Sequence, residues 1–397
     1  MNKIGMRLTW LGVEMRLISV ILFIVEFVRG AVLISLLPIY GAKVLHLSLD
    51  IIGLAITAHY LTDTLLKLIF GYLLDRFSIR FVIRTGLFVS LIGVFLIPFA
   101  TVPWLFIMAA ALYGIGISPI WIVCLTKVSK DNRATQIGFL YTVWLVGLGS
   151  GPIVCNILLD YYLNKTYFLL LILSVIGAFL AFFISSKRSD EPSVQAVPLN
   201  RQLSTLVERI KAMRMILPGM IMQTAGASML VPVLPSFAEK GLGLAGTQYS
   251  LLLTAGGVCA AAGLIPMGRL SDKLGGKHWF LIIGFAIFGI GLSLLASRLP
   301  FWYCLVIVVI LGLSYAAILP AWNALLASFV PPNQEGLGWG LLATVEGIGG
   351  MVGPVAGGLI AASFSTSSVI WVSAALFGGI AFLYLIIPSS KLIGKSG

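Results

Sequence analysis

Two stretches of this sequence decide its fold: Gly71–Arg84, which reads GYLLDRFSIRFVIR, and Gly268–Lys277, which reads GRLSDKLGGK. Each stretch interrupts a long apolar region with a short polar loop, and their carboxylates, Asp75 and Asp272, lie 197 positions apart. A glycine beside such a loop permits close approach of two helices, and the carboxylate can accept hydrogen bonds from a neighbouring helix N-terminus. The recurrence predicts two halves built on one plan.

The composition requires a membrane as the surrounding medium. Hydrophobic residues make up 59% of the 397 residues, charged residues make up only 10%, and the mean hydropathy is +1.06. A soluble domain of this size could not place so much apolar surface against water. The net charge of +12 does not indicate nucleic acid, because most lysines and arginines fall in loops predicted on one side of the membrane.

The chain therefore reads as an all-α membrane protein with twelve spans, six in each half. The predicted spans are 17–40, 51–74, 81–100, 104–125, 136–160, 167–186, 215–238, 248–268, 279–297, 301–326, 337–362 and 368–388. The first bundle covers 1–186, a charged linker covers 187–214, and the second bundle covers 215–397. Both termini and the linker are basic and even numbers of spans separate them, so we expect all three in the cytoplasm.

The two polar loops resemble the loop between helices 2 and 3 of the major facilitator superfamily, roughly G-x-L-A-D-R-x-G-R-K. The matching residues are Gly71, Leu73, Asp75, Arg76 and Arg80 in the first loop and Gly268, Leu270, Asp272, Gly275 and Lys277 in the second. Ser78 and Ile79 depart from the pattern, as does Gly276. The resemblance implies two pseudo-symmetric six-helix bundles around a central cavity. It also implies a role in conformational gating for Gly71, Asp75, Arg76, Arg80, Gly268, Asp272 and Lys277.

The most informative residues are charges inside the first two spans. Glu26 and Arg29 are three residues apart and share a face of span 1. His59, Asp63 and Lys67 step by four along one stripe of span 2. A charge at a helix centre costs roughly 2.5 to 3.5 kcal/mol on insertion scales unless it faces a partner or water. The spacing predicts two polar stripes that meet between adjacent helices and face the cavity.

The second half keeps the shape of the first but not its charges. At an offset of 197, Glu26 corresponds to Gln223 and Asp63 to Ala260. The architecture alone therefore does not require these carboxylates. One interpretation is a proton-coupling site of Glu26 and Asp63 tuned by Arg29, since a desolvated carboxylate can bind and release a proton as the cavity changes sides. The other is a static ion-pair network that braces the two spans.

Candidate substrate contacts are aromatic and polar residues placed inside spans. Trp121 and Trp144 lie within spans 4 and 5 rather than at the interface, and an indole suits a sugar ring or an aromatic drug. Glu346 is the comparable charge of the second half, where a substrate or gating contact and a simple interhelical hydrogen bond are both open. His59 is either a packing residue or a cavity contact.

A closer resemblance is carried by a set of short motifs along most of the chain: Glu26-Phe27-x-Arg29-Gly30, His59 with Asp63, Ser118-Pro119-Ile120-Trp121, Trp144 and Pro320-Ala321-Trp322-Asn323. The set is similar to the glycolipid flippases of lipoteichoic acid synthesis in Gram-positive bacteria. That resemblance implies proton-coupled movement of a diglucosyl-diacylglycerol anchor to the outer leaflet of the cell membrane. It assigns coupling to Glu26, Arg29 and Asp63 and headgroup binding to Trp121 and Trp144. We add His59, Trp322, Asn323 and Glu346 as candidate substrate contacts.

The remaining features exclude other classes of protein. Four cysteines, Cys124, Cys155, Cys259 and Cys304, show no metal-ligand or redox spacing, and we expect neither a metal nor a cofactor. No nucleophile with a base and no phosphate loop occurs, so we expect no enzyme. The expected partners are protons, membrane lipids and an amphiphilic substrate, with the chain acting as a monomer. A proton-driven exporter of drugs or small metabolites is the alternative function.

Overall fold

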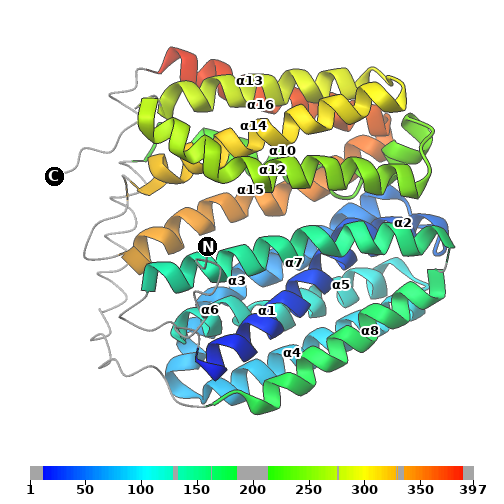
Figure 1. Ribbon diagram of the computed structural model, residues 1–397. Helices are drawn as coiled ribbons and strands as arrows, with labels where there is room; N and C mark the ends of the chain where they lie inside the picture. Colours follow the sequence, from blue (N-terminus) through cyan, green and yellow to red (C-terminus); the bar gives the residue numbers. More distant parts are fainter. Residues whose placement is uncertain are drawn as a thin grey trace, which may run out of the picture. The chain divides into compact units, whose positions relative to one another are not determined.

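The computed structural model describes residues 12–127, 133–161, 163–185, 213–274, 277–327, 329 and 335–387, and every regular element within them is a helix (Figure 1). The long apolar runs give these helices their length. Polar residues begin some of them: the Ser78 hydroxyl accepts a hydrogen bond from the Phe81 amide at 3.3 Å, and Ser365 accepts one from the Ser368 amide at 3.1 Å.

The helices of the first half follow one another with short connections. They are α1 (Val13–Gly30), the π-helix η2 (Ala31–Leu36), α2 (Leu37–Lys43), α3 (Leu49–Arg76), α4 (Ile79–Leu96), the 3-10 helix η3 (Ile97–Phe99), α5 (Pro103–Ile117), α6 (Pro119–Thr126), α7 (Arg133–Tyr161), α8 (Leu163–Leu180) and the 3-10 helix η4 (Ala181–Phe183). The predicted linker 187–214 lies outside the described residues except for its last two positions.

The helices of the second half repeat this order. They are α10 (Leu217–Ser228), α11 (Leu234–Ser236), the π-helix η5 (Phe237–Gly241), α12 (Gly246–Leu274), α13 (Lys277–Ala296), α14 (Phe301–Ala327), α15 (Glu335–Ser363) and α16 (Thr366–Ile386). By its internal contacts the chain divides into two compact units. Unit 1 comprises Met1–Leu47 and Ala58–Val194, and unit 2 comprises Ser48–Thr57 and Gln195–Gly397.

Each unit is built from the same helix pairs. In unit 1, α1 packs on α7 and α8, while α4 packs on α5 and α8. In unit 2, α10 packs on α15 and α16, while α13 packs on α14 and α16. The internal repeat in the sequence is therefore matched by a repeat in the packing.

Prolines account for breaks in two predicted spans and accompany a change of helix type in a third. Span 104–125 is divided at Ser118 because Pro119, the first residue of α6, has no amide hydrogen to continue the ladder of α5. Span 215–238 is divided by a turn at 229–233, because Pro232 within the turn and Pro235 at the start of α11 remove two helical donors. Span 17–40 is continuous but passes through the π-helix η2 just before Pro38.

Among the described residues, ten helices are long and apolar enough to cross a membrane. Two of the twelve predicted spans are not among them. Span 215–238 is the broken segment, and span 248–268 lies in α12, where glycine and alanine replace many of the larger apolar side chains. The remaining ten predicted spans are each matched by a helical segment of sufficient length.

Candidate functional site

A buried ion cluster joins α1 to α3 inside unit 1. The guanidinium of Arg29 lies between two carboxylates, with Nη1 3.4 Å from Oε1 of Glu26 and Nη2 3.6 Å from Oδ2 of Asp63. The same Asp63 oxygen accepts a hydrogen bond from Nζ of Lys67 at 3.0 Å. The carboxylates are almost fully enclosed, with 2% and 4% of their side chains exposed, whereas the Lys67 side chain is 40% exposed. The two polar stripes meet as their spacing predicts.

His59 lies one turn before Asp63 on α3 and is fully buried. Its imidazole stacks on the Tyr113 ring of α5, with centroids 5.3 Å apart and planes 27° apart, and it meets the Tyr60 ring edge-on with centroids 5.5 Å apart. The imidazole is thus fixed by aromatic packing on the α5 side of the stripe. The structure accordingly places His59 in the packed interior of unit 1.

Close helix crossings fix the backbone beneath the cluster. A Cβ added at Gly147 of α7 would lie 2.9 Å from the Phe23 carbonyl oxygen and 3.1 Å from the Cβ of Glu26, so glycine allows α7 to pack closely on this turn of α1. A Cβ added at Gly114 of α5 would lie closer still to the His59 carbonyl oxygen, so glycine is required at this crossing of α5 and α3. The Ser118 hydroxyl donates a 2.8 Å hydrogen bond to the Asp63 carbonyl oxygen, which ties α3 to the break between α5 and α6.

This arrangement suits reversible proton binding. The cluster contains two carboxylates and two cations, so it is neutral when every member is ionised. The Arg29 contacts of 3.4 and 3.6 Å are longer than the 2.7–2.9 Å of a tight charge-assisted bond. Because Glu26 and Asp63 share Arg29, a proton on either one loosens its hold on the guanidinium and strengthens the contact of the other.

The tryptophans of the first unit lie on α6 and α7. Trp121 is half-buried, and its ring meets the edge of Tyr141 with centroids 4.8 Å apart at 62°. Trp144 is also half-buried, three residues after Tyr141 on α7. Both indoles are therefore partly accessible within predicted spans, as a ligand contact requires.

The predicted residues of the second unit form a separate pair. Trp322 of α14 is only 1% exposed, and its indole Nε1 donates a 2.9 Å hydrogen bond to Oε1 of Glu346 on α15. Its ring packs against Phe285 and Tyr384, with each centroid 6.2 Å away. Asn323 is exposed. The arrangement makes Trp322 the anchor of Glu346 rather than an open aromatic face.

Arg80 and Arg84 bind carbonyls in η4 and just after it. Arg80 donates from Nε to the Ile184 carbonyl at 2.8 Å, and Arg84 donates to the Phe182 carbonyl at 2.8 Å while lying 4.7 Å from the centre of that ring. These cations satisfy carbonyls left free at a helix C-terminus. Gly268 has ordinary packing space against Pro320. The side chains of Asp75, Arg76, Asp272 and Lys277, together with Gly71, lie outside what the structure describes.

Two features were not found from the sequence. Tyr113 supports His59, but it lies in an apolar run and nothing there distinguishes it from a packing residue. Lys127 pairs with Glu14, 113 positions away, at 2.6 Å, and both contact Ser185. No local spacing signals a pair so distant in sequence.

Two bundles of apolar helices, with an enclosed and balanced ion cluster in the first, define a multi-pass membrane transporter and not an enzyme. The chain belongs to the Major Facilitator Superfamily, whose sequence pattern matches residues 18–221 and again 216–396. The prediction that the chain belongs to this superfamily is confirmed, as is the major facilitator fold.

Several curated relatives carry one name. The protein named proton-coupled antiporter flippase LtaA is 30% identical in Staphylococcus saprophyticus, over 92% of this chain and 93% of the relative. The protein of that name from Staphylococcus haemolyticus is 31% identical over 93% of both chains. Among solved structures, the nucleoside transporter NupG superposes with a TM-score of 0.77 at 14% identity, covering 94% of this chain and 98% of its own, which shows the fold.

Proposed function

We propose that this chain is a proton-coupled antiporter that flips a glycolipid of the diglucosyl-diacylglycerol type from the inner to the outer leaflet of a bacterial cell membrane. The ion cluster of Glu26, Arg29, Asp63 and Lys67 carries the coupling half of the proposal. It places two enclosed carboxylates on one shared guanidinium. The names of the LtaA relatives support the antiport and flippase half.

Alternating access would expose the cluster to each side of the membrane in turn. A proton that enters from outside binds Glu26 or Asp63 and cancels one negative charge, so the cluster becomes net positive. Release toward the cytoplasm restores the balanced state. Coupling follows if substrate binding and protonation compete for the same arrangement of Arg29, and two carboxylates this close titrate as a pair.

The substrate contacts follow from the half-buried indoles. Trp121 and Trp144 offer partly accessible aromatic faces to the sugar rings, and their N–H groups can bond hydroxyls. Asn323 and Glu346 complete the proposed set of substrate contacts, and the buried His59 and Trp322 support the set through their packing against Tyr113 and their bond to Glu346. The loop residues Gly71, Asp75, Arg76, Arg80, Gly268, Asp272 and Lys277 are proposed to gate the cytoplasmic side, on which both termini lie.

The experiment is reconstituted flipping. Purified protein in proteoliposomes is given a fluorescent diglucosyl-diacylglycerol, and headgroup accessibility is followed with and without an inward proton gradient. We expect gradient-stimulated flipping that Asp63→Asn and Glu26→Gln each abolish while the protein stays folded. Asp50→Asn, the same change at the start of the same helix, is the matched control and retains flipping.

Two outcomes redirect the proposal. Gradient-driven flipping that persists in both carboxylate variants removes the coupling role from the cluster. Absence of flipping above protein-free liposomes, in a folded preparation that still moves protons in response to an amphiphilic drug, favours the exporter. Trp121→Ala tests the headgroup contact, because its loss of flipping with retained proton movement places the sugar near α6.

A further inference from the structure

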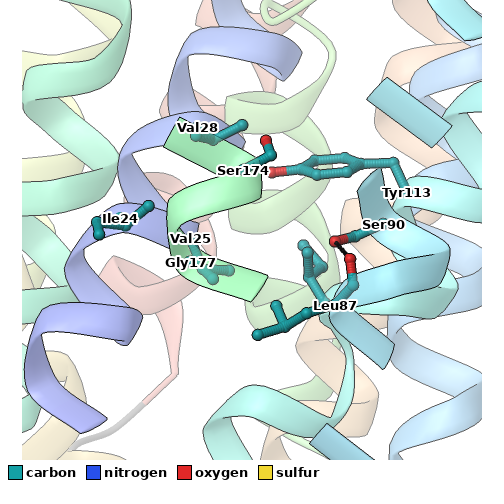
Figure 2. A pocket seen from close by; sticks show the side chains of 9 residues that line it. Ile24, Val25, Val28, Leu87, Ser90, Tyr113, Ser174 and Gly177 are labelled. Carbon is teal, nitrogen blue, oxygen red and sulfur yellow. Dashed lines mark hydrogen bonds between the residues drawn. The ribbon is translucent and has the colours of Figure 1, made fainter. Parts of the chain in front are cut away.

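A small cavity lies within unit 1, between α1, α4, α5 and α8 (Figure 2). Its volume available to the centre of a water molecule is about 10 Å³. Most of its lining is apolar, and three of its residues carry hydroxyl groups: Ser90, Tyr113 and Ser174. This space is about the minimum that holds one water molecule.

Among the residues that the structure describes, none forms a hydrogen bond with the hydroxyl of Tyr113, although Tyr113 is only 2% exposed. Its ring extends from α5 toward Ser174 of α8, so the phenol is directed into the cavity (Figure 2). Buried phenols normally have a hydrogen-bond partner, because an unsatisfied polar group in an apolar interior is costly. The unused phenol is therefore an observation independent of the cavity.

The two serines fix the polarity of the site. Ser90 donates its hydroxyl proton to the Leu87 carbonyl at 2.8 Å, and Ser174 donates its proton to the Leu170 carbonyl at 2.8 Å. Each serine oxygen is then left as an acceptor only. One water molecule fits this pattern, since it can donate to both serines and accept from Tyr113. It would make three hydrogen bonds, the usual number for a buried water.

We propose that this cavity binds a single structural water that bonds Tyr113, Ser90 and Ser174, and that Tyr113 is thereby a positioning residue for His59. The bonded phenol fixes the ring whose face stacks on the imidazole at 5.3 Å. The imidazole in turn lies one turn from Asp63 on α3. The second half of this inference rests on the proposed proton coupling, whereas the water site itself does not.

A structure determined at a resolution that shows ordered water tests the site directly. Density for one water within hydrogen-bond distance of all three oxygens is the expected result. An empty cavity, or a phenol turned to a backbone carbonyl, overturns the proposal. This measurement needs neither substrate nor a proton gradient.

The direction in which Tyr113→Phe changes the unfolding temperature is an independent test of the bound water. If the cavity is dry, removing an unsatisfied buried hydroxyl leaves the protein as stable or more stable; if the water is bound, the substitution lowers the unfolding temperature. We expect a decrease. Ser174→Ala should also decrease it, by more than Ser293→Ala, which loses the same kind of bond to a carbonyl four residues earlier but lies in unit 2. In the double variant, the decreases in unfolding temperature caused by Tyr113→Phe and Ser174→Ala should be less than additive, because both substitutions remove bonds to the same water.

Filling the cavity with a methyl group is a further test of whether it holds a water molecule or is dry. A Cβ at Gly177 would lie 3.4 Å from Cγ2 of Ile24, and both residues line the cavity. Gly177→Ala should displace the water and gain less stability than Gly378→Ala, whose Cβ meets nothing within 4 Å. A larger gain at Gly177 than at Gly378 indicates a dry cavity and contradicts the proposal.

The positioning role has its own readout. Nitrogen-15 NMR of the histidines in lipid nanodiscs resolves His59 from His46 and His278, with His59→Gln for assignment. Tyr113→Phe should shift the His59 imidazole signals and lower gradient-driven transport by about 2- to 10-fold, the change that corresponds to one hydrogen bond. Unchanged His59 signals refute the positioning role. If the wild-type protein shows no proton-driven transport, the proposed function fails. The water density and the unfolding temperatures still decide whether the water site exists.

Discussion

Nη2 of Arg29 lies 3.6 Å from Oδ2 of Asp63, and this contact joins α1 to α3 inside the first unit. The same guanidinium reaches Glu26 through Nη1 at 3.4 Å, so one side chain serves two carboxylates. The fork of a guanidinium presents its nitrogens in fixed directions, which allows this double contact. Position 29 therefore requires the shape of a guanidinium as well as a positive charge.

Arg29→Lys tests that requirement. An ammonium keeps the positive charge, but it is a single point that cannot hold both carboxylates in this geometry. We expect gradient-driven transport to fall at least about tenfold, equivalent to roughly 1.4 kcal/mol, with little loss of protein in the membrane. Arg16→Lys, on the exposed side of α1, is the matched control and should transport normally. Full activity in Arg29→Lys would show that charge suffices.

A glycine pair on α7 tests the helix crossing that supports the cluster. A Cβ at Gly151 would lie 2.8 Å from the Ala31 nitrogen and closer still to the Phe27 carbonyl oxygen, whereas a Cβ at Gly149 meets nothing within 4 Å. We expect Gly151→Ala to destabilise the protein by about 1 to 3 kcal/mol through overpacking and to reduce transport. Gly149→Ala should be neutral or slightly stabilising. Thermal unfolding in detergent compares the two, and equal effects would argue against this crossing.

The two members of the Glu14–Lys127 ion pair should affect stability unequally when each is replaced. The Lys127 side chain is 3% exposed and that of Glu14 is 37% exposed. Glu14→Gln removes the charge partner of an enclosed ammonium, so we expect a loss of about 3 kcal/mol or more. Lys127→Met leaves a carboxylate that water can reach, and we expect a loss of about 1 kcal/mol or less. Unfolding temperatures measure both, and the reverse order would contradict the burial of Lys127.

The sequence predicted much of the site because helix periodicity is a local property. Glu26 with Arg29 and Asp63 with Lys67 follow from spacings of three and four, and the contact of the two stripes follows from the need to pair charges in an apolar medium. The interior role of Tyr113 did not follow. It depends on which helix faces α3, and hydropathy does not contain that information.

The same limit explains the differences in the second unit. A tryptophan inside a span has no preferred face by composition, so Trp322 was expected to line the cavity and instead packs at 1% exposure. The break at 229–233 was readable in principle, because Pro232 and Pro235 remove helical donors three residues apart. Hydropathy averaged over a whole span does not reveal such a break, since the residues around the break are still apolar.

The hydrogen bond from Trp322 to Glu346 gives the last prediction. Glu346→Gln keeps an acceptor oxygen for the indole N–H, so we expect the unfolding temperature to stay near that of the wild-type protein. Trp322→Phe keeps an aromatic ring against Phe285 and Tyr384 but removes the donor. It should cost about 1.5 to 3 kcal/mol, the range for a bond to a charged group.

Transport then separates the two roles of Glu346. If the carboxylate contacts substrate, as proposed, Glu346→Gln remains stable and yet loses at least about tenfold in flipping, roughly 1.4 kcal/mol. Trp371 on α16 is 49% exposed, so Trp371→Phe controls for the loss of an indole. It should change neither the unfolding temperature nor flipping. Normal flipping by Glu346→Gln would leave the residue as the acceptor of an interhelical bond, because its charge would then have no part in transport.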